Sequence, residues 1–182
     1  MTDEPRTSHR LYVLIVGLAL LVIAADQASK WWAETELADG QMRPLLGDFI
    51  RLRLVYNPGA AFSIGEGFTW IFAIVAAIVA VAIAWFAWRV RSRAWAVVFG
   101  LVLGGAVTHL GDRLFREPGF ARGHVVDFIV YGDWFVGNIA DIAIVGGALL
   151  GLLLTLLQVS MKRDDPAKVH ADTDPPSDGA TA

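Results

Sequence analysis

Long stretches without a charged residue constrain this chain more than any other feature of its sequence. They cover residues 67–88, 94–111 and 142–161, and a shorter one covers 11–25. A helix needs about 20 predominantly apolar residues to cross the hydrocarbon core of a bilayer. Hydrophobic residues make up 55% of the 182 positions, more than in an ordinary soluble domain. The sequence therefore predicts an all-α membrane protein whose transmembrane helices include these stretches.

The stretch at 11–25 is too short to span a bilayer by itself, but the sequence can continue the helix through Trp32. Asp26 and Lys30 are four residues apart, so they share one helix face and can pair. Trp31 and Trp32 would then lie at the membrane interface, where indoles are favoured. These features predict a fourth span at about 11–32. Basic residues before a short apolar run are also compatible with a cleavable signal peptide.

The segment between the first two spans predicts a small β-element outside the bilayer, at about 42–63. Residues 50–54 alternate apolar and basic side chains, which is the period of a half-exposed strand. The Asn-Pro-Gly at 57–59 then predicts a turn. Residues 1–163 are thus expected to form a single domain with spans at about 11–32, 67–88, 94–111 and 142–161. Residues 164–182, rich in Asp, Pro, Ser and Ala, are expected to be a disordered cytoplasmic tail.

The distribution of positive charge predicts the orientation of the spans. Four spans put both termini on one side, together with the basic connection at 89–93. Lysine and arginine are enriched in cytoplasmic loops, so both termini are expected in the cytoplasm. Aspartates from four separate segments then fall toward the outer ends of the spans: Asp26, Asp112, Asp127 and Asp141. The sequence thus brings carboxylates to one level of the membrane.

The composition excludes several kinds of functional site. The chain has no cysteine, which excludes disulfides, thiolate metal sites and cysteine nucleophiles. A net charge of −3 gives no basic face for nucleic acid. The sequence contains no G-x-S-x-G, H-E-x-x-H or P-loop motif. Its histidines do not cluster as zinc ligands; they are His9, His109, His124 and His170. We therefore expect no metal site and no cofactor.

The stretch from Val125 to Asp141 places two aspartates in strongly apolar sequence. A carboxylate in such surroundings is costly unless the protein uses it. Two carboxylates that converge do not both ionise easily, and a pair sharing one proton suits acid–base chemistry such as aspartic peptide hydrolysis. Asp127 and Asp141 are therefore candidate catalytic residues. A small proton- or ion-coupled transporter using the same carboxylates is an alternative, although the sequence shows no repeat of broken helices.

Several motifs, in order along the chain, resemble those of the lipoprotein signal peptidase (signal peptidase II) family. They are Asp26-Gln27-x-x-Lys30, the run Asn57-Pro58-Gly59-Ala60-Ala61-Phe62-Ser63, Gly104-Gly105-Ala106 with Asp112-Arg113, Val125-Val126-Asp127-Phe128, and Asn138-x-Ala140-Asp141. The resemblance covers roughly Leu11 to Val159. It implies a four-helix aspartyl protease of the bacterial inner membrane with an extracytoplasmic active site. Its implied substrates are prolipoproteins, cleaved just before a diacylglyceryl-modified cysteine; membrane lipid is a further partner, and we expect a monomer.

The resemblance also implies roles for individual residues. Asp127 and Asp141 match the catalytic pair of the family. The remaining matches are substrate-contacting or supporting positions: Asn57 and Arg113 for substrate or the inhibitor globomycin, Asp112 and Asn138 near the pair, and Asp26 and Lys30 in the first motif. One position departs from the family pattern, because His109 stands where asparagine is usual. This departure leaves a degenerate, non-catalytic homologue as a further alternative.

Some of these residues also have purely structural interpretations. Asp26 and Lys30 fit a structural ion pair better than a catalytic one. Arg113 is compatible with a simple pair to Asp112 or with a lipid phosphate. His124 fits a solvated loop residue, although a position three residues before Asp127 would also let it tune the pair.

Overall fold

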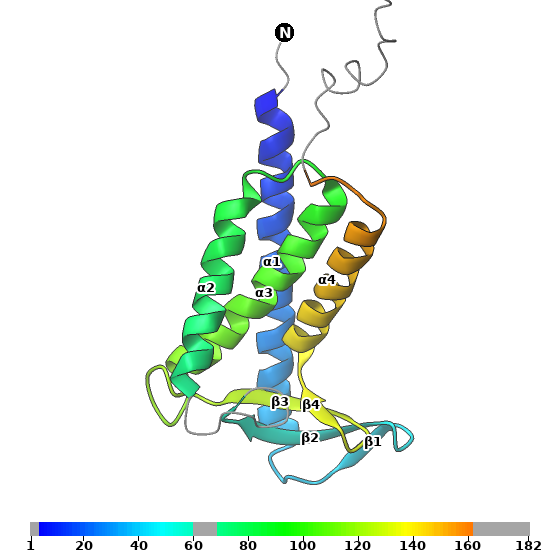
Figure 1. The fold of residues 1–182 in the computed structure, drawn as a ribbon. Coiled ribbons are helices and arrows are strands. Elements are labelled where there is room, and N and C mark those ends of the chain that lie inside the picture. The colour runs from blue at the N-terminus through cyan, green and yellow to red at the C-terminus, as the bar shows by residue number, and fades with distance from the viewer. Residues whose placement is uncertain (1–3, 60–68, 162–182) are drawn as a thin grey trace, which may run out of the picture.

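The computed structural model describes residues 4–59 and 69–161, and all structural statements refer to these ranges. They contain the helices α1 (Glu4–Glu36), α2 (Thr69–Ala87), α3 (Arg93–Phe115) and α4 (Ile139–Leu156). Each helix is long and apolar enough to cross a membrane. The helices run side by side, and a small sheet lies across one end of the bundle (Figure 1). The predicted four-helix membrane fold with a β-element is therefore confirmed.

The helices extend beyond the charge-free stretches that predicted them. Helix α3 continues through Phe115 and therefore includes Asp112 and Arg113, while α4 begins at Ile139 and holds Asp141 in its first turn. A helix can continue past the first charged residue wherever that residue finds a partner, and these residues do. Parts of the expected β-element (60–63) and the expected tail (164–182) lie outside the described residues.

The β-element is larger than the sequence predicted. Strands β1 (Arg43–Leu46) and β2 (Ile50–Asn57) lie in the expected segment, but β3 (Val125–Tyr131) and β4 (Phe135–Gly137) join them in one antiparallel sheet of order β1-β2-β3-β4. The interpretation of Val125–Tyr131 as no more than apolar sequence around an aspartate was incomplete. A strand buried on both faces is continuously apolar rather than alternating, and residues 125–130 are all buried.

Helix α3 is the centre of the bundle, because it packs against α1, α2 and α4. Two adjacent glycines bring it close to two neighbours. A Cβ on Gly104 would lie 2.6 Å from the Val22 Cβ of α1, and a Cβ on Gly105 would lie 2.5 Å from the Ile144 Cγ1 of α4. Small residues at such contacts let membrane helices approach closely. The close fit at Gly105 fixes the beginning of α4, the helix that carries Asp141.

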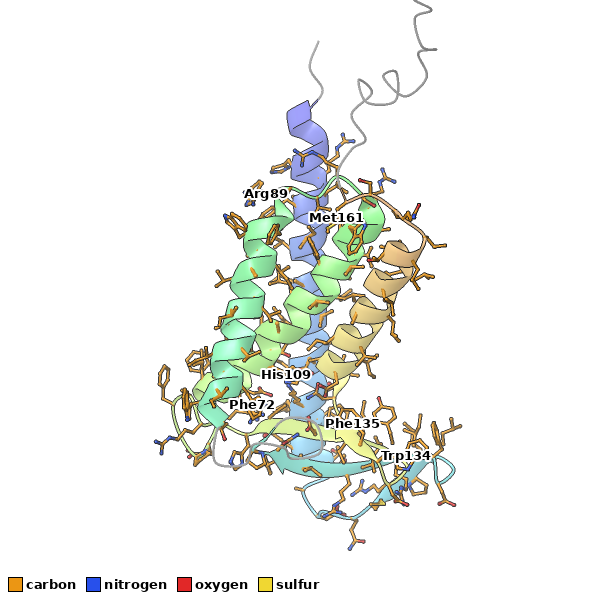
Figure 2. The ribbon with its side chains drawn as sticks, viewed as in Figure 1. Phe72, Arg89, His109, Trp134, Phe135 and Met161 are labelled. Carbon is orange, nitrogen blue, oxygen red and sulfur yellow. The ribbon has the colours of Figure 1, made fainter. Side chains whose placement is uncertain are left out.

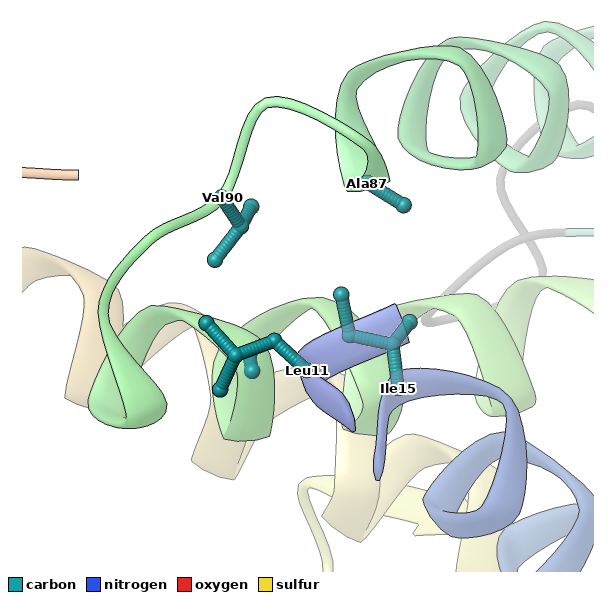
Figure 3. Close-up of a cluster of buried hydrophobic side chains, with 5 residues drawn as sticks. Leu11, Ile15, Ala87 and Val90 are labelled. Atoms are coloured by element: carbon teal, nitrogen blue, oxygen red, sulfur yellow. The ribbon is translucent and has the colours of Figure 1, made fainter. Parts of the chain in front are cut away.

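The end of the bundle opposite the sheet is held by a cluster of buried apolar residues. Leu11 and Ile15 of α1 face Ala87 at the end of α2 and Val90 in the connection that follows, and Ala96 of α3 completes the cluster (Figure 3). The lipid-facing surfaces are also apolar: exposed fractions reach 64% at Leu21, 69% at Val81 and 61% at Leu149. The bundle therefore suits a hydrocarbon environment on its outside.

Candidate active site

A cavity of about 610 Å³ lies between α2, α3 and α4, next to the sheet. Its walls are apolar and come mainly from the three helices, whereas its polar groups come from the sheet end of the bundle. The apolar lining includes Phe72, Val75, Val79, Val102, Ala106 and Ile144. The polar lining is Asn57, His109, Arg113, Asp127 and Asp141. Figure 2 shows Phe72, His109 and Phe135 at the end of the helices that meets the sheet. The structure thus gathers both candidate catalytic aspartates in one cavity.

Asp127 lies in the middle of β3 and is only 3% exposed. Its Oδ1 accepts a hydrogen bond of 2.7 Å from the Asn138 side-chain amide, and its Oδ2 accepts one of 2.9 Å from the Asn57 amide. The pKa of Asp127 is raised to about 6: burial is the largest cause, the Asn57 hydrogen bond opposes the rise, and the Asp141 carboxylate adds to it. The desolvation cost of the charged form exceeds the stabilisation by these amides. Asp127 can therefore hold a proton at mildly acidic pH.

Asp141 is fixed by the beginning of α4. Asn138 is the N-cap of the helix, and its side-chain oxygen accepts a hydrogen bond of 3.1 Å from the Asp141 backbone amide. In return, the Asp141 Oδ2 accepts one of 2.8 Å from the Asn138 backbone amide. This reciprocal capping box satisfies two amides of the first turn. The other Asp141 oxygen, Oδ1, lies 3.1 Å from His109 Nε2.

Asn138 connects the two carboxylates directly. Its side chain is fully buried, and it caps the helix that carries Asp141 while its amide donates to Asp127. A second donation, of 3.2 Å, goes to the Val126 backbone oxygen. One side chain thereby fixes the strand and the helix relative to each other. The family resemblance implied a supporting position for Asn138, and these hydrogen bonds would allow such a role.

Arg113 binds the end of β2 and the segment before β3 rather than forming a hydrogen bond to a carboxylate. Its guanidinium donates hydrogen bonds to backbone oxygens of Asn57 (2.8 Å), Gly123 (3.1 Å) and Gly59. The side chain is 4% exposed, yet it borders the cavity. The suggested pairing of Arg113 with Asp112 is therefore wrong. Neighbouring positions on a helix point about 100° apart, so Asp112 faces α1 instead.

Asp112 belongs to a buried ion network between α1 and α3. Lys30 Nζ lies 2.6 Å from both Asp26 Oδ2 and Asp112 Oδ2, and all three side chains are at most 2% exposed. Arg116 extends the network, since it pairs with Asp112 at 2.8 Å and with Glu34 at 2.6 Å. The sequence did not lead us to predict Arg116 or Glu34, although the i,i+4 spacing of Asp112 and Arg116 was a usable signal.

The network lies beside the cavity and contacts the backbone of α4, the helix that carries Asp141. Asp26 Oδ1 accepts a hydrogen bond of 2.9 Å from the Ala140 amide, one residue before Asp141. Neither Asp26 nor Lys30 lines the cavity. These contacts favour the structural interpretation of the Asp26–Lys30 pair. His124 also stands outside the described cavity lining, as a loop residue would.

Comparison with known proteins agrees with this architecture. The family described as signal peptidase (SPase) II matches residues 18–157. A lipoprotein signal peptidase of Leifsonia xyli is 45% identical over 174 residues, covering 93% of this chain and 81% of the relative. A lipoprotein signal peptidase of Mycobacterium avium is 46% identical over 153 residues, covering 84% of each chain. A solved structure described as a bacterial membrane enzyme superposes with a TM-score of 0.70 at 26% identity, covering 83% of this chain and 92% of that one.

The matched range contains both aspartates of the cavity, Asn138 and the whole of α2, α3 and α4. The relatives are similar over most of their own length as well as over most of this chain. The chain therefore belongs to the signal peptidase II family and is a multi-pass membrane peptidase.

Proposed function

We propose that this peptidase is of the aspartic type, with Asp127 and Asp141 as its catalytic residues. The observation that carries the proposal is that the two carboxylates border one cavity and are joined by a single buried side chain, Asn138. As a lipoprotein signal peptidase, the enzyme removes signal peptides from prolipoproteins. We place the scissile bond at the polar end of the cavity, before a diacylglyceryl-modified cysteine.

The chemistry follows from one proton shared between two carboxylates. The ionised aspartate takes a proton from water as the water oxygen attacks the scissile carbonyl carbon. The protonated aspartate donates its proton to the carbonyl oxygen, which gives a neutral tetrahedral diol. The newly protonated aspartate then donates to the amide nitrogen, the C–N bond breaks, and a diol hydroxyl returns its proton to the other aspartate. The pair ends in its starting state.

The shape of the cavity suits a substrate that is part peptide and part lipid. Three helices supply apolar walls for acyl chains or apolar signal-peptide residues, and the carboxylates stand where those walls meet the sheet. A substrate can therefore keep its acyl chains among the helices while its peptide reaches the pair. Membrane lipid is a partner in this sense, and the cavity is formed within one chain, so a monomer suffices.

The remaining site residues act as substrate contacts or supports. Asn57 and Arg113 border the cavity, and Asn57 also donates to Asp127, so we assign them to substrate contact. Asn138 and the Asp26–Lys30–Asp112 network hold β3, α3 and α4 in place. We further propose that the enzyme lies in the bacterial cytoplasmic (inner) membrane, with the sheet end extracytoplasmic and both termini cytoplasmic.

Replacement of each aspartate by asparagine tests the assignment. Asp127→Asn and Asp141→Asn should each lose on the order of 10²-fold or more in cleavage of a diacylglyceryl-modified prolipoprotein, because asparagine transfers no proton. The double variant should be scarcely slower, since groups that act as a unit are not additive. Asp39→Asn is the matched control, because Asp39 is half exposed. Its described contacts are the ion pair with Arg43 and a hydrogen bond from the Gln41 backbone amide. Near wild-type turnover by either folded single variant would remove that aspartate from the mechanism.

A further inference from the structure

We propose that His109 is a positioning residue that holds Asp141 ionised, so that Asp141 is the base and Asp127 carries the catalytic proton. The inference rests on the aspartic mechanism proposed above and adds to it an assignment of the two roles. It also assigns a role to a side chain in which the sequence showed only a departure from a family pattern.

The contact places a titratable cation on one oxygen of one aspartate. His109 lies on α3 and faces α4, where its Nε2 is 3.1 Å from Asp141 Oδ1. The other Asp141 oxygen already accepts the Asn138 backbone amide at 2.8 Å. With a proton on both ring nitrogens, the imidazolium donates to Oδ1 and leaves the carboxylate fixed on both oxygens. A charge-assisted hydrogen bond of this kind is stronger than one between neutral groups.

Two further features favour the charged form at Asp141 over Asp127. Asp141 lies in the first turn of α4, where the helix dipole stabilises negative charge. Its side chain is 23% exposed, whereas Asp127 is 3% exposed within a buried strand. The described hydrogen bonds to the Asp127 carboxylate come from the neutral amides of Asn57 and Asn138. Ionisation therefore costs more at Asp127.

The other cationic side chains near His109 form no described hydrogen bond to the carboxylate oxygens of Asp127 or Asp141. Arg113, one turn further along α3, donates to three backbone oxygens, and Lys30 of α1 is bound between Asp26 and Asp112. Helix α2, on the remaining side of the cavity, contains no charged residue between Thr69 and Ala87. From the sheet come Asp127 itself and Tyr131, whose hydroxyl is neutral near pH 7. Among the described residues, His109 is thus the side chain that can carry a positive charge and lies within hydrogen-bond distance of a dyad oxygen.

The imidazolium of His109 affects the pH range of cleavage. Activity falls at low pH when the base becomes protonated, and the imidazolium opposes that protonation because it is an adjacent opposite charge. Removing the imidazolium should move the low-pH side of the activity profile upward by about one pH unit. This is the smallest shift that an adjacent opposite charge usually causes. At a fixed pH on this acid limb, such a displacement corresponds to about a tenfold lower rate.

The experiment compares three enzymes over the pH range from about 4 to 9. Wild type, His109→Asn and His109→Gln are purified in detergent, and kcat/KM is measured on a diacylglyceryl-modified prolipoprotein. Both variants keep an amide donor but lack the charge, so we expect the acid limb to move up by about one pH unit. His9→Asn is the control, because His9 is exposed at the far end of α1. An acid limb at the wild-type pH in both folded variants would overturn the proposal.

A second measurement reads the carboxylate without turnover. In Asp127→Asn protein with ¹³C-labelled aspartate carboxyls, the Asp141 carbon resonance should move when His109→Asn is added, because the neighbour of its Oδ1 has been replaced. An unchanged resonance would also overturn the role of His109. The two proposals can fail separately. Active Asp127→Asn or Asp141→Asn enzyme would refute the aspartic mechanism. Inactive aspartate variants, together with an unchanged pH profile in the His109 variants, would refute only the role of His109.

Discussion

Asp127 shows how a buried carboxylate is costly to the fold that holds it. A carboxylate in the middle of a buried strand is desolvated, and its pKa rises from 3.8 to about 6 for that reason first. The folded state therefore binds a proton more tightly than the unfolded chain does. The stability that the proton on Asp127 contributes to the folded state is present at low pH and is lost as pH rises through about 6.

Asp127→Asn should therefore stabilise the protein at alkaline pH although it slows cleavage on the order of 10²-fold or more. Asparagine has no proton to lose, and the rise in pKa from 3.8 to about 6 corresponds to about 3 kcal/mol as an upper value at pH 8. Poorer hydrogen bonding to the amides of Asn57 and Asn138 reduces the gain. Thermal melting in detergent should show a higher midpoint for the variant at pH 8 and little difference at pH 4. A lower midpoint at pH 8 would mean that the hydrogen bonds outweigh the desolvation of Asp127.

The helices are joined to one another by polar groups at the sheet end and by small residues along their length. Lys30 compensates two buried carboxylates from different helices, and Asp26 passes the connection on to the α4 backbone at Ala140. Gly105 lets α3 contact the same turn of α4. The position of Asp141 thus depends on two kinds of contact that lie outside the cavity.

Lys30→Ala should reduce the yield of folded protein more than the activity of each folded molecule. Without Lys30, both Asp26 and Asp112 remain buried, and Arg116 still pairs with Asp112 but not with Asp26. Breaking a buried ion pair costs about 3–5 kcal/mol. Arg43→Ala, which breaks the half-exposed pair with Asp39, is the matched control and should change the yield little. Yield by gel filtration and cleavage per folded molecule separate the two effects. An abundant, stable but inactive Lys30→Ala protein would instead give Lys30 a direct role in the chemistry.

Gly105→Ala should lower activity by displacing the start of α4. Its Cβ would lie 2.9 Å from the Ala140 backbone oxygen, in the turn that carries Asp141, so α4 has to shift. A small displacement of a catalytic group costs rate steeply, here on the order of 10-fold or more. Gly146→Ala is the control, because a Cβ there meets nothing within 4 Å and alanine favours the helix. Equal cleavage rates for the two folded variants would show that the site tolerates movement of α4.

The two ends of the bundle differ in character at the scale of the whole molecule. One end carries the sheet and the polar part of the cavity, and the other carries the connection between α2 and α3 (Figure 1). The chain after α4 returns to that connection, where the Arg91 amide donates to the Met161 oxygen at 2.9 Å. Interfacial aromatic residues occur toward both ends, including Trp31 near the sheet and Trp85 near the connection.

Reporter fusions can test the orientation of these ends in the membrane. A fusion at Arg91, in the basic connection, should report the cytoplasm, and one at Gly40, before β1, should report the opposite side. At each position, one reporter that is active only in the cytoplasm and one that is active only outside it should give opposite results. Detection of both positions on the same side would contradict the proposed topology.

The membrane class and the number of spans could be predicted from the sequence, and so could two aspartates that the structure brings to one cavity. These properties are local: a charge-free stretch long enough for a bilayer predicts a helix whatever surrounds it, and Asp26 and Lys30 pair because of their spacing. The motifs around Asp127 and Asp141 carried the family resemblance, and the match over residues 18–157 bears it out.

How these residues meet became visible only in the folded chain. Val125–Tyr131 forms a central strand because β2 and β4 pair with it, and apolar sequence alone does not distinguish a buried strand from a buried helix. Asn138 joins the two aspartates, Lys30 binds Asp112 across 82 positions of sequence, and His109 reaches Asp141 from another helix. Such contacts depend on the packing of distant segments, which no local pattern encodes.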